Sequence, residues 1–301
     1  MNTYPVYPYY GTFTECKEKP VAFPPQRQEE QPGLEYLMSP RPIYENPAYS
    51  GGRRLENRTA LITGGDSGIG RAAAIAFAKE GADVAIAYLQ EHRDAMETKA
   101  RIEQLGRRCL ALPTDLRMKA ACTAVVEKTV HTFGRLDVLV NNIAVQYPQE
   151  HLTGITEDQL EQTFRTNVYS YFYMTQAALP YLKDGSSIIN TASITAYRGE
   201  KTLLDYSATK AAIVGFTRAL SQNLVDQGIR VNAVAPGPVW TPLIPSSFAA
   251  DRVAVFGTDT PMKRAAQPFE LAPAYVYLAS DDSRYVTGET MHVNGGDFIG
   301  G

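Results

Sequence analysis

Alternating short apolar segments and longer amphipathic segments constrain the fold of this chain more than any other feature. The apolar segments contain few polar interruptions, and each is followed by a stretch with helical spacing. This pattern is typical of a parallel sheet covered by helices on both faces. The chain is therefore predicted to be α/β, a doubly wound fold of about seven parallel strands flanked by helices. The expected strands are 59–63, 83–88, 109–115, 137–142, 187–193, 229–236 and 290–296.

The first 54 residues differ from the rest because they hold nine prolines and seven tyrosines with little periodicity. Proline disfavours helix, so a partly disordered tail is one interpretation. The tyrosines favour another, an arm that packs on its own domain or on a neighbouring subunit, because aromatic area stabilises when it is buried. The sequence thus predicts an N-terminal arm over 1–54 and one domain over 55–301.

Composition narrows the range of partners. Hydrophobic residues make up 44% of the chain, charged residues 20%, and the net charge is −3 without a basic block. These values favour small-molecule chemistry over binding of nucleic acid or anionic lipid. No apolar run approaches the roughly 18 residues of a membrane span, and the N-terminus lacks a signal-peptide pattern. Cys16, Cys109 and Cys122 lack metal-ligand spacing and suggest free thiols, so we expect a cytoplasmic protein without a metal.

A glycine-rich turn, "TGGDSGIG", follows the first predicted strand. Gly64, Gly68 and Gly70 would allow a tight turn and a close approach of the backbone to a pyrophosphate. A helix that starts near Gly70 would direct its N–H groups at the anion. This placement in the first strand–helix unit predicts a dinucleotide site.

The end of the second strand leaves the choice between NAD and NADP open. An acidic residue at this place usually binds the ribose 2′-hydroxyl of NAD, but Tyr88 and Leu89 stand here. No cation lies in the glycine turn, where Ser67 precedes Gly68, and Arg93 is the nearest one downstream.

The segment "YSATK" places Tyr206 and Lys210 four positions apart, on one face of a predicted helix. Ser193 stands thirteen residues earlier, at the end of the fifth strand. Strand ends and helix starts form the ligand crevice of a doubly wound sheet, so the three side chains can meet there. The Lys210 ammonium is expected to lower the pKa of the Tyr206 phenol, which would make it a usable acid and base.

Five motifs in register resemble the short-chain dehydrogenase/reductase family: "TGGDSGIG", "NNIA", "TNV", the serine ahead of "YSATK", and "PGPVWTP". The resemblance covers about residues 55–297, and the extended N-terminus is similar to that of the longer glucose/ribitol dehydrogenase-like bacterial members. It implies an NAD(P)-dependent oxidoreductase that interconverts a secondary alcohol or sugar/polyol hydroxyl and its carbonyl. An alternative is a dinucleotide-binding regulatory or scaffold protein with a vestigial site, and an epimerase-type relative would need a larger C-terminal domain.

The resemblance also implies roles for single residues. Tyr206 would be the general acid/base, Ser193 would bind the reacting oxygen, Lys210 would hold the ribose hydroxyls, and Asn167 would hold a relay water. Asp115 would face adenine, Asn142 would lie along the adenosine ribose, and Val239 and Thr241 would close on the carboxamide. The full implied cofactor-binding set is Gly64, Asp66, Ser67, Gly68, Ile69, Gly70, Tyr88, Leu89, Asp115, Leu116, Asn142, Ile143, Ala144, Tyr206, Lys210, Pro236, Gly237, Val239 and Thr241.

One departure from the family pattern is "NNIA" in place of NNAG, which puts Ile143 and Ala144 at the cofactor wall. We expect the added bulk to reshape that wall without abolishing binding. The loop between Trp240 and Pro261 is either a lid over the crevice or a plain connector. With Val145, Ile194 and Trp240 it suggests a partly apolar pocket.

Apolar residues cover more than one face of the helices after the fourth and fifth strands, in "YFYMTQAALPYL" and "AAIVGFTRAL". Family members commonly pair these helices between subunits. The resemblance therefore implies a homotetramer, to which the arm over 1–54 would add contacts.

Overall fold

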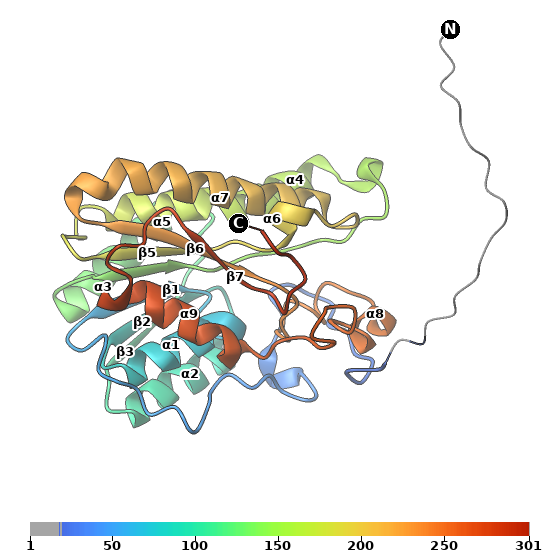
Figure 1. Ribbon diagram of the computed structural model, residues 1–301, viewed down its shortest axis with the longest axis horizontal. Helices are drawn as coiled ribbons and strands as arrows, with labels where there is room; N and C mark the ends of the chain where they lie inside the picture. The colour runs from blue at the N-terminus through green and yellow to red at the C-terminus, as the bar shows by residue number, and fades with distance from the viewer. Residues whose placement is uncertain (1–17, 19, 301) are drawn as a thin grey trace, which may run out of the picture.

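A seven-stranded parallel sheet forms the centre of the protein in a computed structural model that describes residue 18 and residues 20–300 (Figure 1). The strand order is β3-β2-β1-β4-β5-β6-β7, which confirms the predicted doubly wound fold. The strands are β1 (Thr59–Thr63), β2 (Asp83–Tyr88), β3 (Cys109–Pro113), β4 (Val138–Asn141), β5 (Ser187–Thr191), β6 (Arg230–Pro236) and β7 (Thr290–Val293).

Helices cover both faces of the sheet (Figure 1). One layer contains α1 (Gly68–Lys79), α2 (His92–Gln104) and α9 (Pro268–Ala279), and the other contains α3 (Lys119–Phe133), α4 (Glu157–Phe164), α5 (Ser170–Ala178) and α7 (Leu204–Leu224). The short elements are α6 (Thr195–Arg198), α8 (Ala250–Ala254), a π-helical turn η3 (Arg165–Tyr169), and the 3₁₀ turns η1 (Glu35–Leu37), η2 (Leu152–Gly154), η4 (Val225–Gln227) and η5 (Asp281–Ser283).

Two apolar cores, one on each side of the sheet, explain why the strands lack polar alternation. Ala60 and Ile62 of β1 pack in the core beneath α1 and α9. Leu61, between them, points to the opposite face and packs in the core beneath α3 and α5. Because successive side chains alternate across a strand, a strand covered on both faces has to be apolar throughout.

Four strands, β3, β4, β5 and β7, end earlier than predicted, which moves their last polar residues into loops. β5 ends at Thr191, where its pairing with Val234 of β6 also ends. Ser193 therefore lies just beyond the strand, and Asp115 lies beyond β3 in the same way. These residues keep their place at the carboxyl edge of the sheet, where loops are free to present them to a ligand.

The described part of the N-terminal segment packs along its own domain (Figure 1). Phe23 stacks on Trp240 with ring centroids 3.8 Å apart, and the N–H groups of Ala22 and Phe23 both donate to the Ala254 carbonyl. Farther along, the Phe269 N–H donates to Ile43 O. Of the two interpretations, residues 20–54 follow the packed arm. The predictions for residues 1–17, including Cys16, lie outside the described residues, and the boundary at residue 54 stays a prediction.

Candidate active site

A cavity of about 690 Å³ runs along the carboxyl edge of the sheet, from the glycine turn to Tyr206. It is lined by every residue of the implied catalytic and cofactor sets except Gly70 and Asn167, which lie behind its wall. Side chains that sequence reasoning missed also line it. They are Gln31, Glu91, Arg117, Gln146, Thr191, Leu243, Ile244 and Phe248.

The glycine turn has the geometry needed for close approach of a phosphate. Gly64 adopts a left-handed backbone with φ +67°. A Cβ on Gly70 would lie 1.9 Å from the Gly64 carbonyl oxygen, so no larger residue fits between turn and helix. The turn therefore fits the dinucleotide cradle that its sequence predicts. α1 begins at Gly68 rather than near Gly70.

A buried carboxylate from the arm occupies part of the helix N-terminus. The Gly68 N–H donates to Glu35 Oε2 at 2.7 Å, and Arg71 Nη1 donates to Glu35 Oε1 at 2.7 Å. Asp94 accepts from the Glu35 N–H at 2.7 Å and completes the group. Burial raises the pKa of the Glu35 carboxyl, and the Arg71 guanidinium opposes that effect. The arm is thereby tied to the turn through charges that would be costly to separate.

Two carboxylates lie at the end of the cavity where sequence reasoning found no acid. Asp66 and Glu91 are 4% and 3% exposed beside Tyr88, and both line the cavity. Glu91 folds back so that Oε2 accepts from the N–H groups of Leu89 and Gln90, at 3.1 and 2.7 Å. Burial raises the pKa of Asp66, and the Glu91 charge adds to this effect. Asp66 belongs to the cofactor-binding set that the resemblance implies, whereas sequence reasoning missed Glu91, because it lies three positions beyond the end of β2.

The arginines of this neighbourhood are all engaged elsewhere. Arg71 is paired with Glu35, and Arg117 is paired with Asp115 at 2.6 Å. The Arg93 guanidinium lies over the Tyr36 ring, 4.4 Å from its centroid. Arg93, the nearest downstream cation in the sequence, therefore does not line the cavity.

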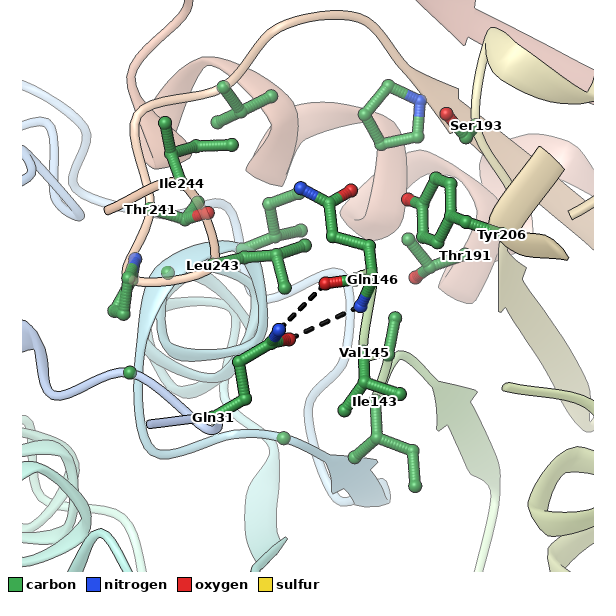
Figure 2. Close-up of a pocket in the computed structure, with 18 of the residues that line it drawn as sticks. Gln31, Ile143, Val145, Gln146, Thr191, Ser193, Tyr206, Thr241, Leu243 and Ile244 are labelled. Carbon is green, nitrogen blue, oxygen red and sulfur yellow. Dashed lines mark hydrogen bonds between the residues drawn. The ribbon is translucent and has the colours of Figure 1, made fainter. Parts of the chain in front are cut away.

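Tyr206, Ser193 and Lys210 converge at the other end of the cavity. α7 begins two residues before Tyr206, which places Tyr206 and Lys210 on one helix face. Lys210 Nζ lies 5.6 Å from the Tyr206 ring centroid and donates to Thr191 O at 2.7 Å. Ser193 lies beside Tyr206 and faces the same space (Figure 2).

The pKa values of Tyr206 and Lys210 differ from those expected from the sequence. Burial raises the pKa of Tyr206 to about 12, opposed by the Ser193 hydroxyl. Burial also lowers the pKa of Lys210 to about 7, so at neutral pH its ammonium is only partly charged. The chain's own groups therefore raise the pKa of Tyr206 instead of lowering it, because desolvation outweighs the hydrogen bond with Ser193.

Asn167 lies in the π-helical turn η3, and its side chain holds a neighbouring loop. Asn167 Oδ1 accepts from the Val145 N–H at 2.8 Å, and Nδ2 donates to Val145 O at 2.9 Å and to Thr209 Oγ1 at 3.1 Å. The side chain thus fixes the wall that follows β4. A relay water held at Asn167 stays a prediction.

Asn142 and Asp115 also have partners within the chain. Asn142 Nδ2 donates to Thr63 O at 3.1 Å, which ties the end of β4 to the glycine turn. Asp115 accepts from Arg117 at the cavity wall, and this pairing lowers the pKa of its carboxyl. Ile143 lies against the glycine turn: a Cβ on Gly64 would meet its Cγ2 at 3.2 Å. The replacement of NNAG by NNIA therefore thickens the cavity wall at the turn.

The loop after β6 forms an apolar wall over the cavity, with Leu243, Ile244 and Phe248 in its lining. Val145 and Ile194 line the cavity as predicted, but the prediction for Trp240 is wrong. Trp240 is fully buried behind the loop, where its ring stacks on Phe23 and its indole N–H donates to Pro40 O at 3.0 Å. The indole therefore packs against Phe23 of the arm and does not face the cavity.

Sequence comparison places this fold and site in a known class. A family model described as "Enoyl-(Acyl carrier protein) reductase" matches residues 64–297. The chain belongs to the short-chain dehydrogenase/reductase family, as its motifs suggested.

Relatives within that family include an uncharacterized oxidoreductase, YhxC, of Bacillus subtilis, 60% identical over 95% of this chain and 100% of the relative. A glucose and ribitol dehydrogenase of Daucus carota is 51% identical over 93% of this chain and 98% of the relative.

Solved structures give the same class. A Burkholderia cenocepacia short-chain dehydrogenase in complex with NADP has a TM-score of 0.77 and 32% identity, over 81% of this chain and 99% of that one. One from Mycobacterium paratuberculosis bound to NAD has a TM-score of 0.74 and 31% identity, over 81% of this chain and 98% of that one. Among the described residues, none of the helices has the length and apolar character needed to cross a bilayer.

Proposed function

We propose that the protein is an NAD(P)-dependent oxidoreductase that interconverts a secondary alcohol or sugar/polyol hydroxyl and its carbonyl by hydride transfer. The observation that carries this proposal is one continuous cavity that joins the glycine turn to the trio Ser193, Tyr206 and Lys210. The cofactor is NAD or NADP, and when bound it supplies or accepts the hydride.

The chain's own side chains would position the substrate and move its proton. Tyr206, protonated at neutral pH, would donate its proton to the carbonyl oxygen during reduction and remove it from the alcohol during oxidation. Ser193 Oγ would bind the same oxygen. Lys210, which is fixed to Thr191 O, would hold the cofactor ribose. The apolar wall of Leu243, Ile244 and Phe248 would limit access of water.

A substrate panel tests this function directly. We expect NAD(P)H oxidation with at least some aldehydes, ketones or keto-sugars, and NAD(P)⁺ reduction with the matching alcohols or polyols. Initial rates would be measured for each substrate with each cofactor. Dinucleotide binding without turnover across the panel would favour a regulatory protein with a vestigial site instead.

The direction of the Tyr206 shift predicts different pH profiles for the two directions. Because burial raises the phenol pKa to about 12, Tyr206 stays protonated from pH 6 to 9. The ionisation of Tyr206 should therefore change the rate of carbonyl reduction little over this pH range. Alcohol oxidation needs the phenolate, so its rate should rise with pH. Initial rates at saturating cofactor would be measured in both directions, and an oxidation rate that falls between pH 6 and 9 would contradict the assignment.

We also propose that NAD is preferred over NADP. A 2′-phosphate on the adenosine ribose would approach Asp66 and Glu91, while the nearby arginines are paired with other groups. Burial raises the pKa of the Glu91 carboxyl, and the two backbone hydrogen bonds that it accepts oppose this effect and favour its charged form. A 2′-hydroxyl could instead donate to either carboxylate.

We further propose that the protein acts in the cytoplasm as a homotetramer on small molecules rather than on nucleic acid. Phe172 of α5 is 40% exposed and packs against Phe216 of α7 with tilted rings whose centroids lie 4.0 Å apart. Leu160 and Leu204 add exposed apolar area on the neighbouring helices. Light scattering at micromolar concentration should give a tetramer mass, and a monomer would contradict this proposal.

A further inference from the structure

One buried amide in the cavity is not used by the mechanism above. Gln146 follows β4 and is 4% exposed, and its side chain points into the space between Tyr206 and the loop bearing Thr241 and Leu243 (Figure 2). Within the described part of the chain, its carboxamide makes no side-chain hydrogen bond, although the amide carries two donor hydrogens and an acceptor oxygen. Neither amide atom is among the described side-chain atoms that are buried without a partner, so the carboxamide is open to the cavity and can bind a ligand there.

The backbone that carries Gln146 is held from both sides by side-chain amides. Asn167 binds both the N–H and the carbonyl of Val145, at 2.8 and 2.9 Å. Gln31 of the arm does the same for Gln146: Nε2 donates to Gln146 O at 2.7 Å, and Oε1 accepts from the Gln146 N–H at 3.2 Å (Figure 2). Two consecutive residues are therefore each fixed by a two-point contact, which limits where the Gln146 side chain can go.

The arm segment around Gln31 is itself firmly seated. A Cβ on Gly33 would lie 2.4 Å from Pro242 O, which shows how closely the arm approaches the loop after β6. The Gln28 N–H donates to Pro245 O at 2.7 Å, and the Gln28 side chain exchanges two hydrogen bonds with the backbone of Leu34. Gln31 thus links a rigid arm to the opposite wall of the cavity.

We propose that Gln146 selects substrates with a hydroxyl beside the reacting carbon, and that Gln31 is a positioning residue for it. A hydroxyl both donates and accepts, so it matches a carboxamide, and it would reach Gln146 while the neighbouring carbonyl oxygen lies at Tyr206 and Ser193. The favoured class is therefore α-hydroxy carbonyl compounds and the vicinal diols that they form. This inference rests on the proposed function, since it concerns the same site.

The test compares 1-hydroxy-2-butanone with 2-butanone, which differ by one hydroxyl. The wild-type holoenzyme should reduce the hydroxyketone with a higher kcat/KM. Gln146→Leu, which keeps the bulk and removes the polar atoms, should lower kcat/KM for the hydroxyketone by about 10- to 100-fold and change that for 2-butanone by about twofold or less. Equal losses for both ketones would overturn the proposal.

Gln31→Leu tests the positioning role, and Gln28→Leu is its matched control. Gln31→Leu should raise KM for the hydroxyketone and reduce the preference between the two ketones, with kcat for 2-butanone retained. Gln28→Leu removes hydrogen bonds within the arm but none to Gln146, so it should lower the melting temperature and leave the preference unchanged. If both variants lower the preference equally, Gln31 acts through general stability and its assigned role is wrong.

A protein that turns over no member of the substrate panel would contradict the proposed function. If it fails only with these two ketones, the proposed function stands, and in either case binding decides the inference separately. With saturating dinucleotide, 1-hydroxy-2-butanone should raise the melting temperature more than 2-butanone does, and Gln146→Leu should abolish that difference. Equal shifts for the two ketones in the wild-type protein would overturn the role of Gln146.

Discussion

Replacing Tyr206 by phenylalanine should lower kcat by about 100- to 10,000-fold, the range typical of a lost general acid/base. The substitution removes only the hydroxyl, and the ring keeps its place in the apolar cluster with Trp240, Leu203 and Phe248. The melting temperature and the dissociation constant for the dinucleotide should therefore stay close to those of the wild-type protein. Steady-state kinetics, thermal unfolding and equilibrium binding measure the three quantities.

A matched control is Tyr197→Phe. Tyr197 packs against His292 and Phe298 outside the cavity lining, so its hydroxyl has no place in the proposed chemistry. The Tyr197→Phe variant should retain the wild-type kcat. Wild-type turnover by Tyr206→Phe would exclude the tyrosine as the proton donor, and another group would have to be sought.

NADP⁺ should bind about 100-fold more weakly than NAD⁺, because a 2′-phosphate dianion would lie against the Asp66 and Glu91 carboxyl groups. Glu91→Gln should narrow this gap, chiefly by strengthening NADP⁺ binding. Calorimetry with each cofactor gives the two dissociation constants for each protein. Glutamine keeps the shape of the site and removes only the charge of Glu91. A change in the ratio of the two dissociation constants therefore measures the effect of that charge.

Glu103→Gln is the control for this series, since Glu103 lies near the end of α2, the helix that begins just after Glu91, pairs with Lys99 and does not line the cavity. It should leave the ratio of the two dissociation constants unchanged. Equal affinity of the wild-type protein for both cofactors would refute the preference, whereas failure to bind either would refute the dinucleotide site itself.

The sequence predicted the parts of this protein that depend on local patterns. Strands buried on both faces have to be apolar, so β1 and β2 were found at their observed bounds. The glycine turn and the Tyr206–Lys210 spacing were found because each depends on a few adjacent residues.

The features that were missed depend on contacts between distant residues. Gln31 reaches Gln146 across 115 positions, and nothing in either segment alone predicts that contact. Trp240 was placed in the pocket because the partner that removes it, Phe23, lies in an arm with no periodic pattern. The shifts at Tyr206 and Lys210 depend on burial, which spacing does not reveal.

The contacts of the arm affect the order in which parts of the molecule fold. Its partners Trp240, Ala254 and Phe269 lie far downstream of Phe23 and Ile43, so the ribosome makes them much later. Contacts across so long a stretch of chain form slowly, because a large loop has to close first. The arm therefore waits unattached during synthesis until these later partners have been made, and its contacts with them form late.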